Sequence, residues 1–247
     1  MDANPFSLVG KTILVTGASS GIGRGIAMCC ANMGATLVLT ARNEERLKAT
    51  LGLLKGEGHS FVMADLIDDE QIERLAATVP VLDGVVQCAG IGSRIPCKSV
   101  VKGDLDVVIN TNFCAPALLQ AALLRNKKIA KSASIVYIAS AAANMPAIGN
   151  AVYSATKGAI VSYAKCLAQE LASREIRVNC ISPTMVWTDL ALVGATKEQL
   201  EQAQQTYPLK RYGTPEDIGN LAVYLLSDAS SWMTGSNIEI TGGALTL

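Results

Sequence analysis

Short apolar stretches and longer helical patterns alternate along almost the whole chain. The stretches are mostly apolar and β-branched, as strands are, and the helical patterns lie between them. Strand followed by helix, repeated many times, predicts parallel strands joined by right-handed crossovers, with helices on both faces of one sheet. The predicted strands are 12–15, 36–40, 60–63, 84–87, 134–138, 177–181 and 236–240. The predicted helices are about 22–33, 43–55, 68–78, 100–128, 151–173 and 215–227.

The chain reads as one α/β domain over residues 1–247. Half of its residues are hydrophobic, which excludes a disordered chain, and no linker, repeat or low-complexity segment divides it. The least regular part, about 184–212, contains a polar helix rich in Glu and Gln. We expect this part to be a lid on the substrate side, and an ordinary surface excursion is the alternative.

Charge and composition exclude several classes of function. The 21 basic and 21 acidic residues cancel, which argues against nucleic acid as a partner. Residues 132–156 carry no charge, but Ser, Asn, Pro and Gly interrupt them, so we expect no membrane span. The first eleven residues contain the acidic Asp2 and no long apolar run, so we expect no signal peptide. Seven cysteines without CxxC spacing and a single histidine, His59, predict buried thiols, no metal site and a cytoplasmic protein.

Strand 12–15 leads directly into a glycine-rich turn with the spacing G-xxx-G-x-G, and a helix follows. Glycines at such a turn let the backbone approach a pyrophosphate, and the helix N-terminus supplies N–H donors. A tight turn without a ligand is the alternative, but the place between the first strand and the first helix favours a dinucleotide site. The residues predicted to bind it are Gly17, Ser19, Ser20, Gly21, Ile22 and Gly23.

The end of the second strand predicts which dinucleotide is preferred. Dinucleotide sites that bind the ribose 2′-hydroxyl place a carboxylate there, whereas this chain has Arg42. A guanidinium forms charge-assisted bonds with a 2′-phosphate, so we expect NADP(H) to be preferred over NAD(H). The glycine turn has Ser19 and Ser20 and no second basic residue, so the preference is expected to be mild. The alternative is that Arg42 only solvates the end of a strand.

Together with residues farther along, this pattern resembles the short-chain dehydrogenase/reductase family over nearly the whole chain. A Tyr-xxx-Lys motif is common by chance, but here a serine precedes the tyrosine by thirteen residues and the glycine turn lies upstream. The resemblance implies a Rossmann-type, doubly wound, seven-stranded parallel sheet. It also implies NAD(P) at the carboxyl ends of the strands and hydride exchange between a carbonyl and an alcohol. The matching positions are 16–23, Asp65, Cys88-Ala89-Gly90, Asn112, Ser140, Tyr153-x-x-x-Lys157, Pro183, Thr188 and Gly242-Gly243.

The resemblance implies four catalytic residues, which are Asn112, Ser140, Tyr153 and Lys157. Tyr153 and Lys157 are four residues apart, so a helix places both on one face, and a nearby ammonium favours the tyrosinate form. Ser140 follows a predicted strand and can donate to the substrate oxygen. In the family, the asparagine holds a water for proton relay. We assign that role to Asn112 because the residues after it fit the family better than those after Asn110.

Further cofactor contacts are also implied by the resemblance. Asp65 would accept from the adenine amine, although it would be unremarkable as a helix N-cap. The main chain at Val186 and the hydroxyl of Thr188 would hold the carboxamide. Trp187 lines the pocket or packs the lid, and Ile91, Met145 and Met185 would form an apolar pocket. The remaining positions implied for the cofactor are Leu66, Cys88, Ala89, Gly90, Tyr153, Lys157, Pro183 and Thr184.

The chain departs from the family pattern at three places. Gln87 and Cys88 replace two asparagines, one of which ties neighbouring strands, so stability is in question more than chemistry. Thr184 replaces a glycine after Pro183, and Thr241 replaces an aspartate before the last glycine pair. None of the three removes a group that the reaction needs.

The resulting prediction is an NADP-preferring carbonyl reductase, similar in layout to 3-oxoacyl-carrier-protein reductases and to small carbonyl and xylulose reductases. A sugar or polyol dehydrogenase is the alternative. A cofactor sensor is disfavoured because all four catalytic positions are filled, and an epimerase usually needs a longer C-terminal domain. Small apolar residues in 100–128 and 151–173 favour a homotetramer, and the alternative is that they only face the sheet. An acidic carrier protein would need basic residues near the cleft, and the candidates are Arg125, Lys127, Lys128 and Lys131. The alternative is that these residues only solvate the end of a helix.

Overall fold

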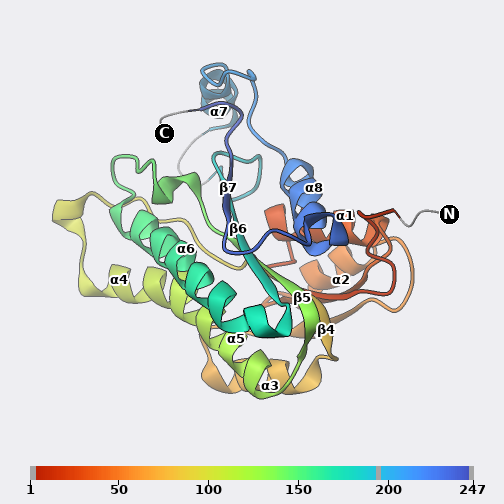
Figure 1. Cartoon of the computed structure of the whole chain (residues 1–247). Coiled ribbons are helices and arrows are strands. Elements are labelled where there is room, and N and C mark those ends of the chain that lie inside the picture. The colour runs from red at the N-terminus through yellow and green to blue at the C-terminus, as the bar shows by residue number, and fades with distance from the viewer. Residues whose placement is uncertain (1–3, 193–195, 245–247) are drawn as a thin grey trace.

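Seven parallel strands form one sheet in the computed structural model, which describes residues 4–192 and 196–244. The strand order is β3-β2-β1-β4-β5-β6-β7, so the predicted seven-stranded parallel sheet is confirmed. Figure 1 shows the sheet with helices around it. The strands are β1 (Thr12–Thr16), β2 (Thr36–Ala41), β3 (Ser60–Met63), β4 (Leu82–Gln87), β5 (Ile129–Ile138), β6 (Arg177–Pro183) and β7 (Asn237–Ile240).

Helices occupy the predicted places, with one interruption. The segment predicted as a single helix over 100–128 is divided by a π-helical turn at Asn110–Cys114. The helices are α1 (Gly21–Asn32), α2 (Glu44–Leu51), α3 (Asp69–Thr78), α4 (Lys102–Ile109), α5 (Ala115–Arg125), α6 (Ala151–Leu171), α7 (Lys197–Gln204) and α8 (Pro215–Leu226).

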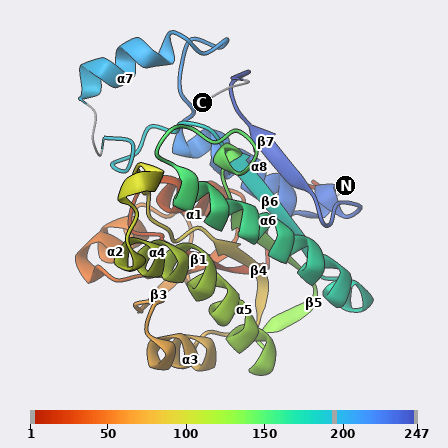
Figure 2. The same ribbon diagram turned by 90° about the vertical axis from the view of Figure 1, so that its left-hand side faces the viewer.

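The two faces of the sheet bury two separate apolar cores. Successive strand residues point to opposite faces, so Leu14 enters one core while Ile13 and Val15 enter the other. The first core packs against α3, α5 and α6, and the second against α1, α2 and α8. Figures 1 and 2 show these two groups of helices on opposite sides of the sheet. Burial on both faces explains why the strands are almost continuously apolar.

The chain leaves the sheet after β6 and returns before α8. The excursion contains α7, which stands apart from the sheet at the top of Figure 1. Its two ends are paired, because Trp187 N–H donates to the Gly213 carbonyl at 2.9 Å and Gly213 N–H donates to the Met185 carbonyl at 3.0 Å. It also has a small core of its own, made by Leu200, Tyr207, Tyr212 and Ala244.

The helical segment Lys102–Arg125 is long and apolar enough, by length and composition, to cross a membrane. In the fold this segment is α4, the π-turn and α5, which pack against α3 and α6. Nearly half of its most apolar stretch is buried inside the protein. A core helix of a soluble protein has the same properties, so the segment is no indication of a membrane span.

Candidate active site

The candidate residues gather at the carboxyl-terminal edge of the sheet. Strands β1 and β4 are neighbours, and the chain continues from β1 to one side of the sheet and from β4 to the other. This reversal opens a crevice at the strand ends, where open α/β sheets bind their ligands. The glycine turn follows β1, residues 88–90 follow β4, Ser140 follows β5, and Pro183 ends β6.

The glycine turn is a cradle that side chains would fill. Gly17 has a φ of +65°, and a Cβ there would lie 2.9 Å from Ala89 Cα. A Cβ at Gly23 would lie 2.4 Å from the Gly17 carbonyl oxygen. Ser20 precedes α1 without capping it, and no acid lies in the first turn of the helix. Free N–H groups at a helix N-terminus with bare backbone in front of them suit a pyrophosphate.

Two side chains that were not predicted as cofactor contacts brace this turn. The Thr16 hydroxyl accepts hydrogen bonds from the N–H groups of Cys88, at 2.9 Å, and Ala89, at 3.0 Å, and so ties the loop after β4 to β1. The Arg24 guanidinium donates to the Ser19 carbonyl and to the Thr50 hydroxyl. Both residues lie in or beside the motif, but only the fold reveals their partners.

Gln87 stands where the family has one of its two asparagines, and it is buried. Its Nε2 donates to the Pro116 carbonyl over a long 3.4 Å, and its Oε1 has no partner among the described residues. Gln87 therefore binds α5 weakly, and the close tie between β1 and the loop after β4 comes from Thr16.

Arg42 directly follows β2 and is exposed. It forms no hydrogen bond or ion pair with the residues that the structure describes, so its guanidinium is available to a ligand. Asp65 follows β3, where its carboxylate accepts from Ile67 N–H at 3.3 Å. The alternative of Asp65 as a helix N-cap is wrong, because Asp68 caps α3 through the N–H groups of Glu70 and Gln71. Leu66, next to Asp65, is buried.

Tyr153 and Lys157 lie in the first two turns of α6. The Lys157 ammonium is 5.7 Å from the centre of the Tyr153 ring and donates to the Ile138 carbonyl, at the end of β5, at 2.9 Å. The Lys157 side chain is buried, with only 7% of its surface exposed. Its hydrogen bond to Ile138 places the ammonium at the carboxyl end of β5. Ser140, two residues beyond β5, accepts from Ala142 N–H at 3.1 Å, which leaves its own hydroxyl hydrogen free to donate.

Asn112 lies in the π-turn between α4 and α5, and its side chain is buried. Its Oδ1 accepts from Ile91 N–H at 2.8 Å, while its Nδ2 donates to the Ile91 carbonyl at 3.0 Å and to the Thr156 hydroxyl at 3.3 Å. Asn110 is exposed at the start of the same turn. π-turns inserted in α-helices are often found at functional sites.

Gly90 lies close to both Asn112 and Lys157. A Cβ at Gly90 would lie 3.1 Å from Asn112 Oδ1 and 3.7 Å from Lys157 Nζ. A side chain at this position would therefore fill the space between the two polar groups. Thr156 was not predicted as a site residue, and its only sequence signal is its place between Tyr153 and Lys157.

The segment after β6 starts beside the glycine turn. A Cβ at Gly21 would lie 3.2 Å from Thr188 Cγ2, so the two candidate cofactor segments are in contact. Pro183 ends β6 and Val186 is buried, while the Thr184 hydroxyl donates to the Thr241 carbonyl at 3.2 Å. This hydrogen bond joins β6 to β7 at two of the positions that depart from the family pattern.

Trp187 packs within the excursion. Its ring centre is 5.5 Å from that of Tyr212, and its Nε1 donates to Gln204 Oε1 at 3.1 Å. Of the two roles considered for Trp187, the structure supports packing of the lid. Met185, which was expected in an apolar pocket, also packs against this small core.

The cysteines do not form a reactive group. Burial raises the pKa of the Cys88 thiol to about 12 and that of Cys180 to about 12, so both stay protonated at neutral pH. The prediction of buried thiols is confirmed for Cys30 and Cys180 and wrong for Cys97 and Cys166, which are exposed. Cys29, Cys88 and Cys114 are half-buried. In the described part of the chain no group of three His, Cys, Asp or Glu residues could hold a metal.

The basic residues considered for a carrier protein lie at the wrong edge of the sheet. Arg125, Lys127, Lys128 and Lys131 surround the start of β5, whereas Ser140 follows its end. Nine residue steps of strand separate the two ends by about 30 Å. Arg125 pairs with Glu73 and Lys131 with Glu175, as at an ordinary solvated surface. Their placement near the cleft was therefore wrong.

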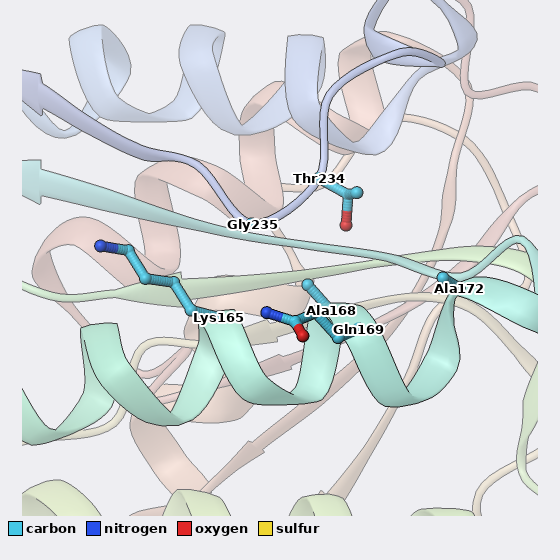
Figure 3. Close-up of a pocket in the computed structure, with 6 residues that line it drawn as sticks. All are labelled: Lys165, Ala168, Gln169, Ala172, Thr234 and Gly235. Carbon is cyan, nitrogen blue, oxygen red and sulfur yellow. The ribbon is translucent and has the colours of Figure 1, made fainter.

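One hollow in the described part of the chain lies away from this site. It has about 370 Å³ and runs between the second half of α6 and the segment before β7 (Figure 3). Lys165, one of its lining residues, comes twelve residues after Tyr153, about 18 Å along the helix. A smaller hollow of about 140 Å³ adjoins Thr184 and Val186 at the root of the excursion.

Comparison with known sequences agrees with this geometry. Residues 17–244 match the protein family described as enoyl-(acyl carrier protein) reductase. The chain is 33% identical to the 3-oxoacyl-[acyl-carrier-protein] reductase of Rickettsia felis, covering 96% of this chain and 98% of the relative. It is 31% identical to human dehydrogenase/reductase SDR family member 4, covering 96% of this chain and 88% of the relative.

Comparison with solved structures gives the same result. A putative NAD(P)-dependent gluconate 5-dehydrogenase from Beutenbergia cavernae, with bound NADP, superimposes with a TM-score of 0.89. It is 34% identical and covers 97% of this chain and 98% of its own.

Proposed function

The chain belongs to the short-chain dehydrogenase/reductase family of oxidoreductases, and from that premise we propose that it is an NADP-preferring ketone reductase of the 3-oxoacyl type. The observation that carries the proposal is the buried Lys157 ammonium, 5.7 Å from the Tyr153 ring, at the edge where Ser140 also lies. The curated relatives of similar length that are named as 3-oxoacyl-[acyl-carrier-protein] reductases support this substrate type.

The residues at the strand edge fit a nicotinamide dinucleotide. The cradle of Gly17, Gly21 and Gly23 leaves room for the pyrophosphate at the N-terminus of α1. Asp65 and Leu66 would lie at the adenine, and Cys88, Ala89 and Gly90 along the middle of the cofactor. At the other end, the main chain from Pro183 to Val186 and the Thr188 hydroxyl would hold the carboxamide. When bound, the cofactor supplies the hydride that goes to the carbonyl carbon.

The protein supplies the proton. As the carbonyl oxygen gains charge, the Tyr153 O–H bond breaks and the proton forms the new hydroxyl of the alcohol. Lys157 stabilises the tyrosinate that remains, and Ser140 donates a hydrogen bond to the same oxygen. One such donor contributes about 3 kcal/mol to transition-state stabilisation. Asn112, beside Lys157, would hold the water through which the proton on Tyr153 is restored.

Arg42 supports the preference for NADP(H). It is the exposed cation directly after β2, and no described residue competes for it. Its guanidinium would pair with the 2′-phosphate through charge-assisted hydrogen bonds. NAD(H) would be accepted more weakly.

A sugar or polyol dehydrogenase is the second candidate. The neighbour from Beutenbergia cavernae, described as a putative gluconate 5-dehydrogenase, is as similar to this chain as the reductases are. The same tyrosine, lysine and serine would serve the oxidation of an alcohol, with each step reversed.

The proposal extends to the organisation of the protein. Residues 1–247 would form one cofactor-binding domain, with a lid at about 184–212 over the substrate. The molecule would act in the cytoplasm as a homotetramer, because exposed apolar residues lie along α4 and α5. Its substrate would be a small carbonyl compound or alcohol, free or linked to a carrier protein.

The test of the mechanism is the consumption of NADPH with a panel of ketones. Tyr153→Phe removes only the hydroxyl, and we expect kcat to fall by about 10²–10⁴-fold, which is the usual contribution of a positioned acid. Tyr163→Phe, on the same helix and away from the strand edge, is the matched control and should keep nearly full activity. Equal activity of Tyr153→Phe and the wild type would refute the mechanism.

A further inference from the structure

The loop between β4 and α4 packs beside the start of α6. Ile95 N–H donates to the Gly149 carbonyl at 2.7 Å, and Gly149 immediately precedes Asn150, the N-cap of α6. Tyr153 lies only four residues beyond Gly149, about one helical turn. A Cβ at Gly92 in this loop would lie 3.5 Å from Leu190 Cδ1 of the excursion. The loop therefore lies between the start of the tyrosine helix and the proposed lid.

The aliphatic part of the Arg94 side chain packs against the backbone of Gly149. Gly149 has a φ of +83°, and a Cβ there would lie 3.3 Å from Arg94 Cγ, so the bare backbone makes room for the stem. Arg94 is exposed and forms no hydrogen bond or ion pair with the residues that the structure describes. Arg24, Arg177 and Arg211, in contrast, all have partners in the fold.

The loop that carries Arg94 has two basic residues and no acidic one. Arg94 and Lys98 are the only charged residues between 88 and 101, and the loop opposite them lies in the charge-free segment 132–156. Asp189 is the single acid in 184–192, and it forms no ion pair in the described part of the chain. The acids at the start of α4 are engaged, since Asp104 accepts from Val101 N–H and Asp106 pairs with Lys102.

From this arrangement we propose that Arg94 binds an anionic group of the substrate and selects ketones that carry a carboxylate or a phosphate. The inference rests on the proposed reductase activity and names its substrate class. A guanidinium binds either group through two parallel N–H donors, which a lysine cannot reproduce. Lys98 adds a less directional attraction from the same loop. Because both side chains are exposed, the effect of their charges decreases as salt rises.

The test compares matched ketones with and without a charge. Acetoacetate and ethyl acetoacetate differ in a carboxylate, and acetoacetyl-CoA and the acetoacetyl thioester of N-acetylcysteamine differ in phosphates. One of the two pairs carries the same anionic group as the natural substrate. For the charged ketone of that pair, Arg94→Gln should lower kcat/KM about 10–100-fold, the loss expected for a charge-assisted hydrogen bond. The neutral member should change less than about threefold. The pair whose charged ketone loses activity shows whether Arg94 binds a carboxylate or a phosphate.

Further variants separate binding from a structural effect. Arg94→Lys should keep part of the selectivity, since it keeps the charge and loses the two-donor geometry. Lys98→Gln should have a smaller effect than Arg94→Gln. Arg74→Gln, an exposed arginine on α3, is the matched control and should change neither pair. Equal loss on charged and neutral ketones would show a structural role, and no loss on either charged ketone would overturn the inference.

A binding measurement keeps this inference distinct from the proposed activity. Acetoacetate and acetoacetyl-CoA are titrated calorimetrically into the NADPH-loaded Tyr153→Phe variant, with and without Arg94→Gln. Weaker binding of one of them after Arg94→Gln supports the anion site even where no ketone of the panel is reduced. Unchanged binding of both overturns it, whereas a wild type that reduces no ketone refutes only the reductase.

Discussion

Lys157 is a buried charge whose described partners are few. The ammonium donates to the Ile138 carbonyl and lies 5.7 Å from the centre of the Tyr153 ring. A buried ammonium needs polar partners to stay charged, and one carbonyl leaves two of its N–H donors for other groups. Those donors are the ones that a ribose and a tyrosinate would use. The side chain is thus held in place by the fold and completed by its ligands.

The proposed preference for NADP(H) is tested at Arg42, again at the scale of one residue. Arg42→Asp removes the partner of a 2′-phosphate and introduces a carboxylate that can accept from a 2′-hydroxyl. We expect the ratio of kcat/KM for NADPH to that for NADH to fall by at least about tenfold, the loss of one charge-assisted bond. Steady-state kinetics with both cofactors measures the ratio. Arg46→Asp, one turn into α2, should leave it nearly unchanged, and a wild type that prefers NADH would contradict the assignment.

Some residues of the site could be predicted from sequence because their relation is local. Tyr153 and Lys157 share a helix face at a spacing of four, and the glycine turn lies between adjacent elements. Thr16 and Thr156 could not be predicted, since their partners are distant in the chain or belong to another helix. Asn112 was chosen by resemblance, but neither its π-turn nor its hydrogen bonds to Ile91, 21 residues away, could be predicted.

Among the elements, the root of the excursion is fixed by an ion pair. The Arg211 guanidinium binds both carboxylate oxygens of Asp217, at 2.6 and 3.1 Å, and Asp217 also accepts from Thr214 N–H at the start of α8. The hydrogen bond from Arg211 is the main cause that lowers the pKa of Asp217 to about 2. One carboxylate thus joins the end of the excursion to the helix that follows.

Asp217→Ala should lower the free energy of unfolding at neutral pH by about 1 kcal/mol, a value reduced for the partial exposure of the pair. Because the pKa is lower in the folded state than the ordinary 3.8, this stabilisation is present above about pH 4 and is lost as the pH falls toward 2. Urea unfolding between pH 7 and pH 3 follows the difference between wild type and variant. A difference that does not shrink below pH 4 would exclude the pair as its cause.

The residue ranges of the strands and helices were largely predictable. Which edge of the sheet a given residue lies at was less predictable. Hydrophobic periodicity located all seven strands, but it missed the first five residues of β5, which are partly exposed. The basic residues around the start of β5 were candidates for the cleft, with a solvated helix end as the alternative, and the structure supports the alternative. A residue that precedes a parallel strand lies at the amino end of the sheet, opposite the ligand crevice.

At the scale of the whole molecule, an apolar surface remains uncovered. Leu105, Ile109 and Leu118 on α4 and α5 are 37%, 38% and 45% exposed, and Val107 is 58% exposed. Large side chains of this kind gathered on consecutive helices are typical of surfaces that bind another protein. A second copy of the chain is the partner that the proposed tetramer requires.

Light scattering should find a species of about four times the 25.8 kDa chain mass. Leu105→Lys combined with Ile109→Lys should shift it to smaller species, since a charge at a buried apolar contact is strongly unfavourable. Val81→Lys, at an exposed position beside the start of β4, is the control and should leave the mass unchanged. A wild type that elutes as a single chain would exclude the tetramer.

The pairing of Val186 with Gly213 has a consequence for how such proteins diversify. The two ends of the excursion are joined at its base, and the entropic cost of closing a loop grows only by about 0.6 kcal/mol for each doubling of its length. The segment can be exchanged for a longer or shorter one while the sheet and the glycine cradle stay as they are. New substrate ranges can therefore arise by grafting at this base, with the hydride chemistry inherited intact.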